Sequence, residues 1–427
     1  MSSTQAATAY LPYTRSTGTI LEPVAPSERI EGLDLLRGWA MFGVLWSNLN
    51  DWYYTTSPVT RLDRALEFGQ TWFIESRFYA LLCLLFGVGF AIQISRAQAR
   101  GMDPRNVYLR RSATLLGIGL IHALLIWHGD ILISYALASF ALLLFRDATP
   151  RQQLVWGILL AVGGNYIGNH LHFALGQTWR VPSQFAGGTP IIYGSGTLAQ
   201  IQATRFRDVA TWWGLFGLTN FFTTTGSFLL GAWAYRSGLV SRVITKRKTT
   251  LTFLAICTVV LLFGYSLEVF HWLNKLWKPL TAPPSSLLTL SAWNPRNVFP
   301  GLLDQTERAG ALLYASLLLL AFQAARGKRL LAPMSAAGRM ALTTYLTQSV
   351  ICTTLFYSYG LGWFGKVGYT GMLEITLSIY AAQLVISIWW LKRFQLGPVE
   401  WLWRTLTYGR APAFRVQSLH DSAPVAV

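Results

Sequence analysis

Histidines and carboxylates that interrupt apolar stretches are the residues of this chain whose chemistry needs an explanation. His128 and Asp130 stand two residues apart between two such stretches, and His122 lies about two helical turns before the first one ends. Histidine suits general acid–base work near neutral pH, and a carboxylate across a turn can orient its ring. We therefore predict His128 and Asp130 as catalytic residues, with His122 and Glu75 as further candidates. The alternative is that an interfacial turn simply contains polar residues and that His122 bonds to a neighbouring helix.

The candidate binding residues begin with Asp34 and Arg37, which open the first apolar stretch. At a spacing of i, i+3 they share one helix face, and a carboxylate there complements the positive helix N-terminus. Arg110 and Arg111 enter the third stretch at the same depth. Together these side chains could form a cationic mouth that holds phosphates, or Asp34 and Arg37 could be an ion pair that only anchors a helix end.

Two amides complete the candidate binding set. Asn48 closes the first apolar stretch, and Gln348 lies near the middle of the ninth. An amide at that depth usually bonds across helices, and a contact with substrate is the alternative.

The composition identifies the environment in which these residues must work. Of the 427 residues, 52% are hydrophobic and 12% are charged, whereas soluble domains average about 25% charged residues. This excludes a soluble enzyme and indicates a membrane protein. The net charge of +17 is not accompanied by a basic, aromatic-interleaved module, so we expect no nucleic-acid partner. The three cysteines lie in apolar stretches without a CxxC pair, so we predict no metal site.

The elements that position these residues are about ten membrane-spanning helices in an all-α bundle. A helix crosses the hydrocarbon core with roughly 17 to 25 residues. The ten candidate stretches are Leu33 to Leu49, Phe78 to Ser95, Ser112 to His128, Ile131 to Phe145, Leu154 to Leu175, Trp212 to Tyr235, Leu251 to Phe270, Ala309 to Ala325, Met340 to Tyr357 and Gly371 to Leu391.

The direction of the bundle follows from its cationic connectors. Arginines crowd the link between the second and third stretches, and Arg and Lys crowd the link between the sixth and seventh. Because cationic loops stay in the cytoplasm, both termini are predicted to be cytoplasmic. We expect a disordered cytoplasmic tail (1–30), an N-terminal half (31–175), a C-terminal half (176–394) and a cytoplasmic interfacial helix with its tail (395–427).

Several motifs resemble the YeiB-like family of bacterial inner-membrane proteins, a family defined by a domain of unknown function. They include the Leu-Asp-x-Leu-Arg-Gly opening at 33–38, Gly-Leu-Ile-His-Ala at 119–123 and Gly-Asp-Ile-Leu at 129–132. Gly-Arg-Met-Ala-Leu-Thr at 338–343 and Gly-Pro-x-Glu-Trp-x-Trp-Arg at 397–404 extend the resemblance towards the C-terminus. The resemblance implies a multi-pass protein of the inner membrane.

The opening motif is also distantly similar to the transmembrane acyltransferases. This similarity implies acyl-CoA bound from the cytoplasm, as a donor and not a permanent cofactor, and an acceptor on the outer side. The histidine of the sugar-decorating enzymes, ten residues after the arginine, is replaced here by Ser47. His128 or His122 would have to take its place, with the CoA phosphates against Arg37, Arg110 and Arg111.

Two functions therefore stand side by side. The first is acyl transfer, and the second is a transporter or flippase for a small or lipid-linked solute, in which the same polar residues line a cavity. Membrane lipids are expected partners in either case. Gly164 and Gly168, at GxxxG spacing, suit close helix packing within the chain or in a homo-oligomer.

Overall fold

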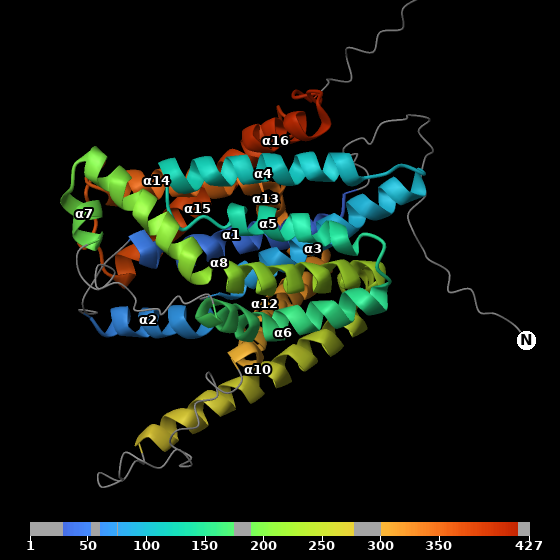
Figure 1. Cartoon of the computed structure of the whole chain (residues 1–427), viewed down its shortest axis with the longest axis horizontal. Helices are drawn as coiled ribbons and strands as arrows, with labels where there is room; N and C mark the ends of the chain where they lie inside the picture. Colours follow the sequence, from blue (N-terminus) through green and yellow to red (C-terminus); the bar gives the residue numbers. More distant parts are fainter. Residues whose placement is uncertain (1–28, 53–59, 75, 175–188, 277–299, 417–427) are drawn as a thin grey trace, which may run out of the picture.

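The computed structural model describes residues 29–52, 60–74, 76–174, 189–276 and 300–416, and within these ranges the chain is helical and forms no strand (Figure 1). The predicted all-α class is confirmed. Of the predicted tail, only residues 29 and 30 fall inside the described ranges. The helices are α1 (Glu31–Trp52), α2 (Arg61–Phe73), α3 (Arg77–Ala99), α4 (Arg105–Leu125), α5 (Leu132–Leu142) with the 3-10 turn η2 (Leu143–Phe145), α6 (Pro150–Ala174), α7 (Thr189–Ser195), α8 (Leu198–Arg236), α9 (Leu239–Thr245), α10 (Arg247–Leu276), α12 (Pro300–Phe322), α13 (Ala325–Arg339), α14 (Ala341–Phe356), α15 (Tyr369–Leu391) and α16 (Pro398–Tyr408).

Each of the ten apolar stretches coincides with one of these helices. They are α1, α3, α4, α5, α6, α8, α10, α12, α14 and α15. Among the described residues, three segments combine the length and the hydropathy that crossing a membrane requires: Arg61–Ala99, Arg247–Ser266 and Tyr369–Leu391. The chain therefore has helices suited to a bilayer.

Connectors between successive long helices alternate between two ends of the bundle. We call the end at which α1 begins the first end. The α3–α4 link lies beside Arg146 of the α5–α6 link. Arg236, at the end of α8, donates to the Ala148 carbonyl of that same link at 2.6 Å. Lys328, which follows α12, forms an ion pair with Glu31 at the start of α1. Four connectors thus share the first end with the start of α1.

Several other connectors, among the described residues, meet at the opposite end. The Ser358 amide, after α14, donates to the Tyr193 carbonyl of α7 at 2.9 Å. Thr370, at the start of α15, donates to the Asp63 carboxylate of α2 through its amide at 3.0 Å and its hydroxyl at 2.8 Å. His128, in the α4–α5 turn, stacks on the Tyr193 ring. This alternation is the pattern of a chain that runs back and forth along one axis.

Helices from both predicted halves pack directly on one another. A side chain at Gly87 of α3 would meet the Phe228 backbone of α8. Gly164 and Gly168 of α6 likewise face α8, where an added methyl group would meet Thr223 and Thr219. The GxxxG spacing therefore serves a contact inside the chain.

A close backbone contact joins α1 to α13. A methyl group at Gly38 would meet the Met334 carbonyl, and one at Gly338 would meet the Asp34 carbonyl. A side chain at either position would overlap the backbone of the other helix, and moving the two helices apart would disrupt their packing, so both positions need glycine. The contact sets the start of α1 directly against the end of α13.

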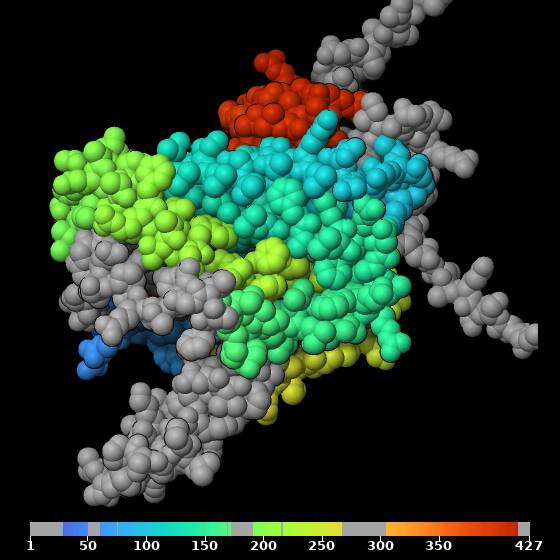
Figure 2. All heavy atoms as spheres, viewed as in Figure 1, coloured from blue at the N-terminus to red at the C-terminus, as the bar shows by residue number. Residues whose placement is uncertain are grey.

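The C-terminal helix is positioned by one carboxylate. Glu400 of α16 accepts hydrogen bonds from the amides of Leu342 and Thr343 at 2.6 and 3.1 Å, and so satisfies the free N–H groups at the start of α14. Burial raises the pKa of this carboxyl group. The helix also lies on α4, which the space-filling view shows as red atoms above cyan ones (Figure 2).

Gly338→Ala tests the α1–α13 contact. Because the added methyl group would overlap the Asp34 carbonyl, we expect a loss of about 1–3 kcal/mol in the free energy of unfolding, read from thermal denaturation of the purified protein in detergent. Gly117→Ala is the matched control, since nothing lies within 4 Å of a methyl group there and α4 should gain slightly. Equal effects of the two substitutions would contradict the contact.

Candidate functional site

A buried pair, His122 and Asp130, is the strongest candidate for chemistry inside the bundle. His122 lies in the last turn of α4, and Asp130 lies in the turn that leads to α5. The ring nitrogen Nδ1 of His122 is 2.6 Å from Oδ2 of Asp130, and the two side chains are 1% and 0% exposed. The other carboxylate oxygen of Asp130 accepts the Ile133 amide at 2.8 Å, as a helix-capping residue does. The Asp130 carboxylate thus bonds to the first turn of α5 and also fixes the orientation of the His122 ring.

The second ring nitrogen of His122 has no partner. A carboxylate can only accept a hydrogen bond, so in the neutral ring the proton is on Nδ1 and Nε2 carries the lone pair. Nε2 is buried and makes no hydrogen bond among the described residues. Buried polar atoms are nearly always satisfied, and an exception calls for an explanation. The arrangement can orient a general base towards a bound group that donates a proton.

Aromatic rings and a glycine shape the surroundings of this pair. The Tyr345 ring of α14 lies 5.1 Å from the His122 ring, and its hydroxyl accepts the Ile131 amide at 3.3 Å. A methyl group at Gly119 would come within 3.0 Å of Asp130 Oδ1 and 2.9 Å of the Ile133 amide nitrogen. The glycine one turn before His122 therefore makes room for the carboxylate.

His128 lies apart from Asp130. The sequence predicted that Asp130 would orient His128, but both oxygens of Asp130 are used by His122 and by the start of α5. His128 instead stacks on the Tyr193 ring at 5.7 Å, and the Tyr193 hydroxyl donates to Asp208 at 2.7 Å. The turn carries His128 to the opposite end of the bundle, under α7, because α4 ends three residues earlier.

The electrostatic surroundings keep His128 neutral. Burial in this turn, outside both flanking helices, and the positive charge of Arg205 lower the pKa of His128 to about 4. Arg205 is itself fully buried and donates to the Leu125 carbonyl at 2.7 Å, which satisfies the end of α4.

Two other predicted residues, Asn48 and Gln348, do not join the pair. Glu75 lies outside the described residues, and its role stays a prediction. Asn48 is half-buried near the end of α1. Gln348 bonds across helices, to the Met41 carbonyl at 3.3 Å and to Gln383 at 2.9 Å. This is the cross-helix bonding that is usual for an amide at this depth, and not the alternative contact with substrate.

The predicted binding residues lie at the first end of the bundle. Arg37 pairs with Asp34 at 2.8 Å. The Arg111 guanidinium stacks on the Trp403 ring at 4.0 Å, whereas Arg110 is exposed, with a terminal nitrogen 3.6 Å from a methyl group placed at Gly409. Arg37 and Arg111 thus meet in one region, and Arg110 lies at its edge.

Sequence reasoning missed three arginines of this region: Arg29, Arg339 and Arg404. Their charges act on one another and on those of Arg37 and Arg111. Arg339 and Arg404 stand in the motifs that carry the family resemblance, so a signal for two of the three was present. Separations of up to 375 positions along the chain hid their proximity.

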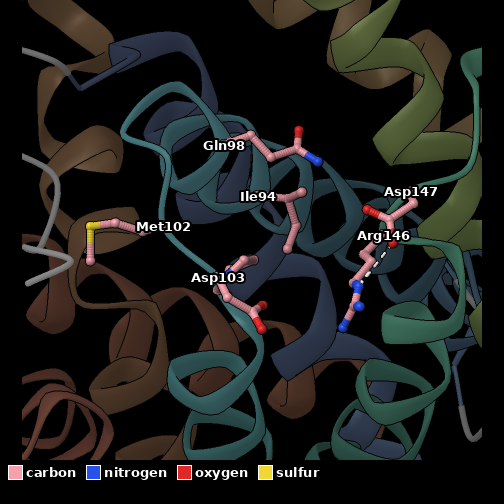
Figure 3. Close-up of a pocket in the computed structure, with 7 residues that line it drawn as sticks. Ile94, Gln98, Met102, Asp103, Arg146 and Asp147 are labelled. Atoms are coloured by element: carbon pink, nitrogen blue, oxygen red, sulfur yellow. Dashed lines mark hydrogen bonds and ion pairs between the residues drawn. The ribbon is translucent and has the colours of Figure 1, made fainter.

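A small cavity at the first end is separate from both groups. Its volume is about 190 Å³, and it lies between the α3–α4 and α5–α6 links (Figure 3). Figure 3 shows Arg146 and Asp147 paired on its rim, and Asp103 from the facing link. Within the described ranges, no group of three or more His, Cys, Asp or Glu side chains could hold a metal ion.

Comparison with known proteins places the chain among uncharacterised relatives. The model for "Protein of unknown function (DUF418)" matches residues 234–410. The "Uncharacterized protein YxaH" of Bacillus subtilis is 33% identical over 418 residues, which covers 91% of this chain and 96% of the relative. The "Uncharacterized protein YeiB" of Escherichia coli is 28% identical, over 89% of this chain and 96% of the relative. No similarity to acyltransferases is among these findings.

The surroundings of His128 predict a pH dependence. The folded chain keeps His128 neutral down to about pH 4, whereas an unfolded histidine binds a proton near pH 6.5. Between these values the unfolded state holds more protons, so stability falls as the pH drops through this window and is unaffected by His128 above it. Thermal unfolding of the purified protein from pH 8 to pH 4 should show a steeper loss than His128→Gln shows. Parallel curves would contradict this environment, since Asp208 and Arg205 are present in both proteins.

Proposed function

From the premise that the chain belongs to the YeiB-like family, we propose that it is a multi-pass inner-membrane protein that transfers an acyl group. The donor is a cytoplasmic acyl-CoA, and the acceptor is a small or lipid-linked molecule on the outer side. The observation that carries the proposal is the buried His122–Asp130 pair with its unpartnered Nε2.

The ten crossings are inferred from the ten apolar stretches, and the length and outer surface of the longer helices support them. The 22 residues of α1 extend about 33 Å at a rise of 1.5 Å each, enough to cross the hydrocarbon core. Large apolar side chains point away from the bundle, such as Ile121 of α4 (60% exposed), Val259 of α10 (67%) and Val385 of α15 (68%). Water would make such a surface costly, whereas lipid would not.

The orientation is supported by the alternating connectors. The arginine-rich links after α3 and after α8 share the first end with the start of α1. Cationic links are retained in the cytoplasm, so the first end would be cytoplasmic. With ten crossings, both termini would be on that side.

The reaction that fits the pair is general-base acyl transfer. His122 Nε2 would take the proton from an acceptor hydroxyl or amine, and Asp130 would stabilise the imidazolium that forms. The acceptor atom would attack the thioester carbonyl. The C–S bond would break, and the proton would pass from Nε2 to the leaving thiolate, giving acylated acceptor and free CoA thiol.

The distance between the two groups suits a long donor. His122 and Arg111 lie eleven positions apart on α4, about 16 Å along the axis. The arm that joins the phosphates of CoA to its thioester would have to cover this distance through the bundle.

His122→Gln tests the proposal, because glutamine keeps a polar side chain but cannot act as a base. Full-length protein in vesicles of native lipid extract, given acetyl-CoA, should release free thiol, and the substitution should lower the rate about 100-fold or more. The matched control is His170→Gln, at an exposed histidine of α6, which should retain the wild-type rate.

Three results keep this test decisive. Unfolding temperatures of both variants show whether either fails to fold. A wild-type protein that releases no more thiol than empty vesicles would overturn acyl transfer. Uptake of an unmodified solute by the same vesicles would then favour the transporter or flippase.

A further inference from the structure

Five arginines from five segments gather at the first end of the bundle. Arg29 precedes α1, and Arg37 lies on its second turn. Arg111 lies on α4, Arg339 ends α13 and Arg404 lies on α16. All five are half-buried, and each lies within electrostatic range of others in the group. We call them the arginine cluster.

Contacts already described hold the cluster in place. The Gly38–Gly338 contact brings the backbones at Arg37 and Arg339 close together, because Arg37 directly precedes Gly38 and Arg339 directly follows Gly338. The Trp403 ring lies under the Arg111 guanidinium, and its Nε1 donates to the Arg111 carbonyl at 3.1 Å. This fixes Arg404, the next residue, over α4.

Nearby carboxylates do not balance the cluster. Asp34 pairs with Arg37, and Glu400 uses its two oxygens on the start of α14. Within the described part of the chain, no hydrogen bond or ion pair satisfies the other four guanidinium groups. The Nε atom of Arg339 is buried and without a partner.

Like charges held this close and partly out of water are costly. Desolvation, followed by the charges of Arg339 and Arg404, lowers the pKa of Arg29 to about 10. Desolvation also lowers the pKa of Arg404. An anion bound among these guanidinium groups would reduce this cost.

We propose that the arginine cluster binds the phosphate groups of a ligand at the first end of the bundle. Guanidinium donates two parallel hydrogen bonds to phosphate, and several guanidinium groups suit a ligand with more than one charge. The phosphate belongs either to a lipid headgroup or to a soluble phosphate compound such as CoA. The site needs no reaction at His122, so it extends beyond acyl transfer and does not depend on it.

Binding to the full-length protein, purified in a phosphate-free maltoside detergent, tests the site. One arm titrates CoA and inorganic pyrophosphate by calorimetry. The other adds phosphatidylglycerol in mixed micelles and counts retained lipid by native mass spectrometry. Wild-type protein is expected to bind in at least one arm, and the arm identifies the source of the phosphate.

Arg339→Gln should weaken that binding about tenfold or more, the effect of removing one charged hydrogen-bond donor. Arg404→Gln should weaken binding by a similar factor. This second variant keeps the test valid if Arg339→Gln fails to fold. The matched control is Arg329→Gln, an exposed arginine on the same helix as Arg339, and it should bind as the wild type does.

Two results would overturn the site: no binding of any probe by the wild type, or an equal loss in Arg329→Gln. Because no turnover is measured, loss of acyl transfer in His122→Gln leaves this test unaffected.

Discussion

Inside an apolar bundle a polar atom has little water to bond with, so it must find a partner in the protein, and this requirement organises the structure. Gln348 bonds to α1 and α15, Arg205 satisfies the end of α4, and Glu400 satisfies the start of α14. Each of these bonds joins helices that are distant in sequence. In the described part of the chain, His122 Nε2 and Arg339 Nε of the arginine cluster are among several buried atoms that find no partner.

The His122–Asp130 pair and the arginine cluster lie at different depths along α4. The cluster is at the first end, where the start of α1, the end of α13 and α16 meet. The pair is near the opposite end, where the turn to α5 brings Asp130 back onto the helix. A single ligand with phosphates at one end and a reactive group at the other would satisfy both.

The sequence predicted the all-α class and the positions of the long apolar helices, because hydrophobic length is a local property. All ten apolar stretches lie on helices, and His128 and Asp130 lie in the turn between two of them, as the sequence indicated. The partner of Asp130 was not predictable by spacing alone. His128 is nearer to Asp130 in sequence, but it follows the end of α4 and points away from the Asp130 carboxylate. Asp130 reaches His122 because the turn after α4 folds back onto that helix. The cluster was predicted only in part. Arg37 and Arg111 were candidate binding residues, whereas Arg339 and Arg404 were missed because they approach Arg37 only through helix packing.

The central claim is that Asp130 holds His122 with a basic nitrogen free. Nitrogen-15 NMR of histidine-labelled full-length protein at pH 8 measures this directly, with the His122→Gln spectrum assigning the signal. The account predicts a neutral ring with the proton on Nδ1 and a lone-pair resonance for Nε2. A protonated Nε2 would contradict it.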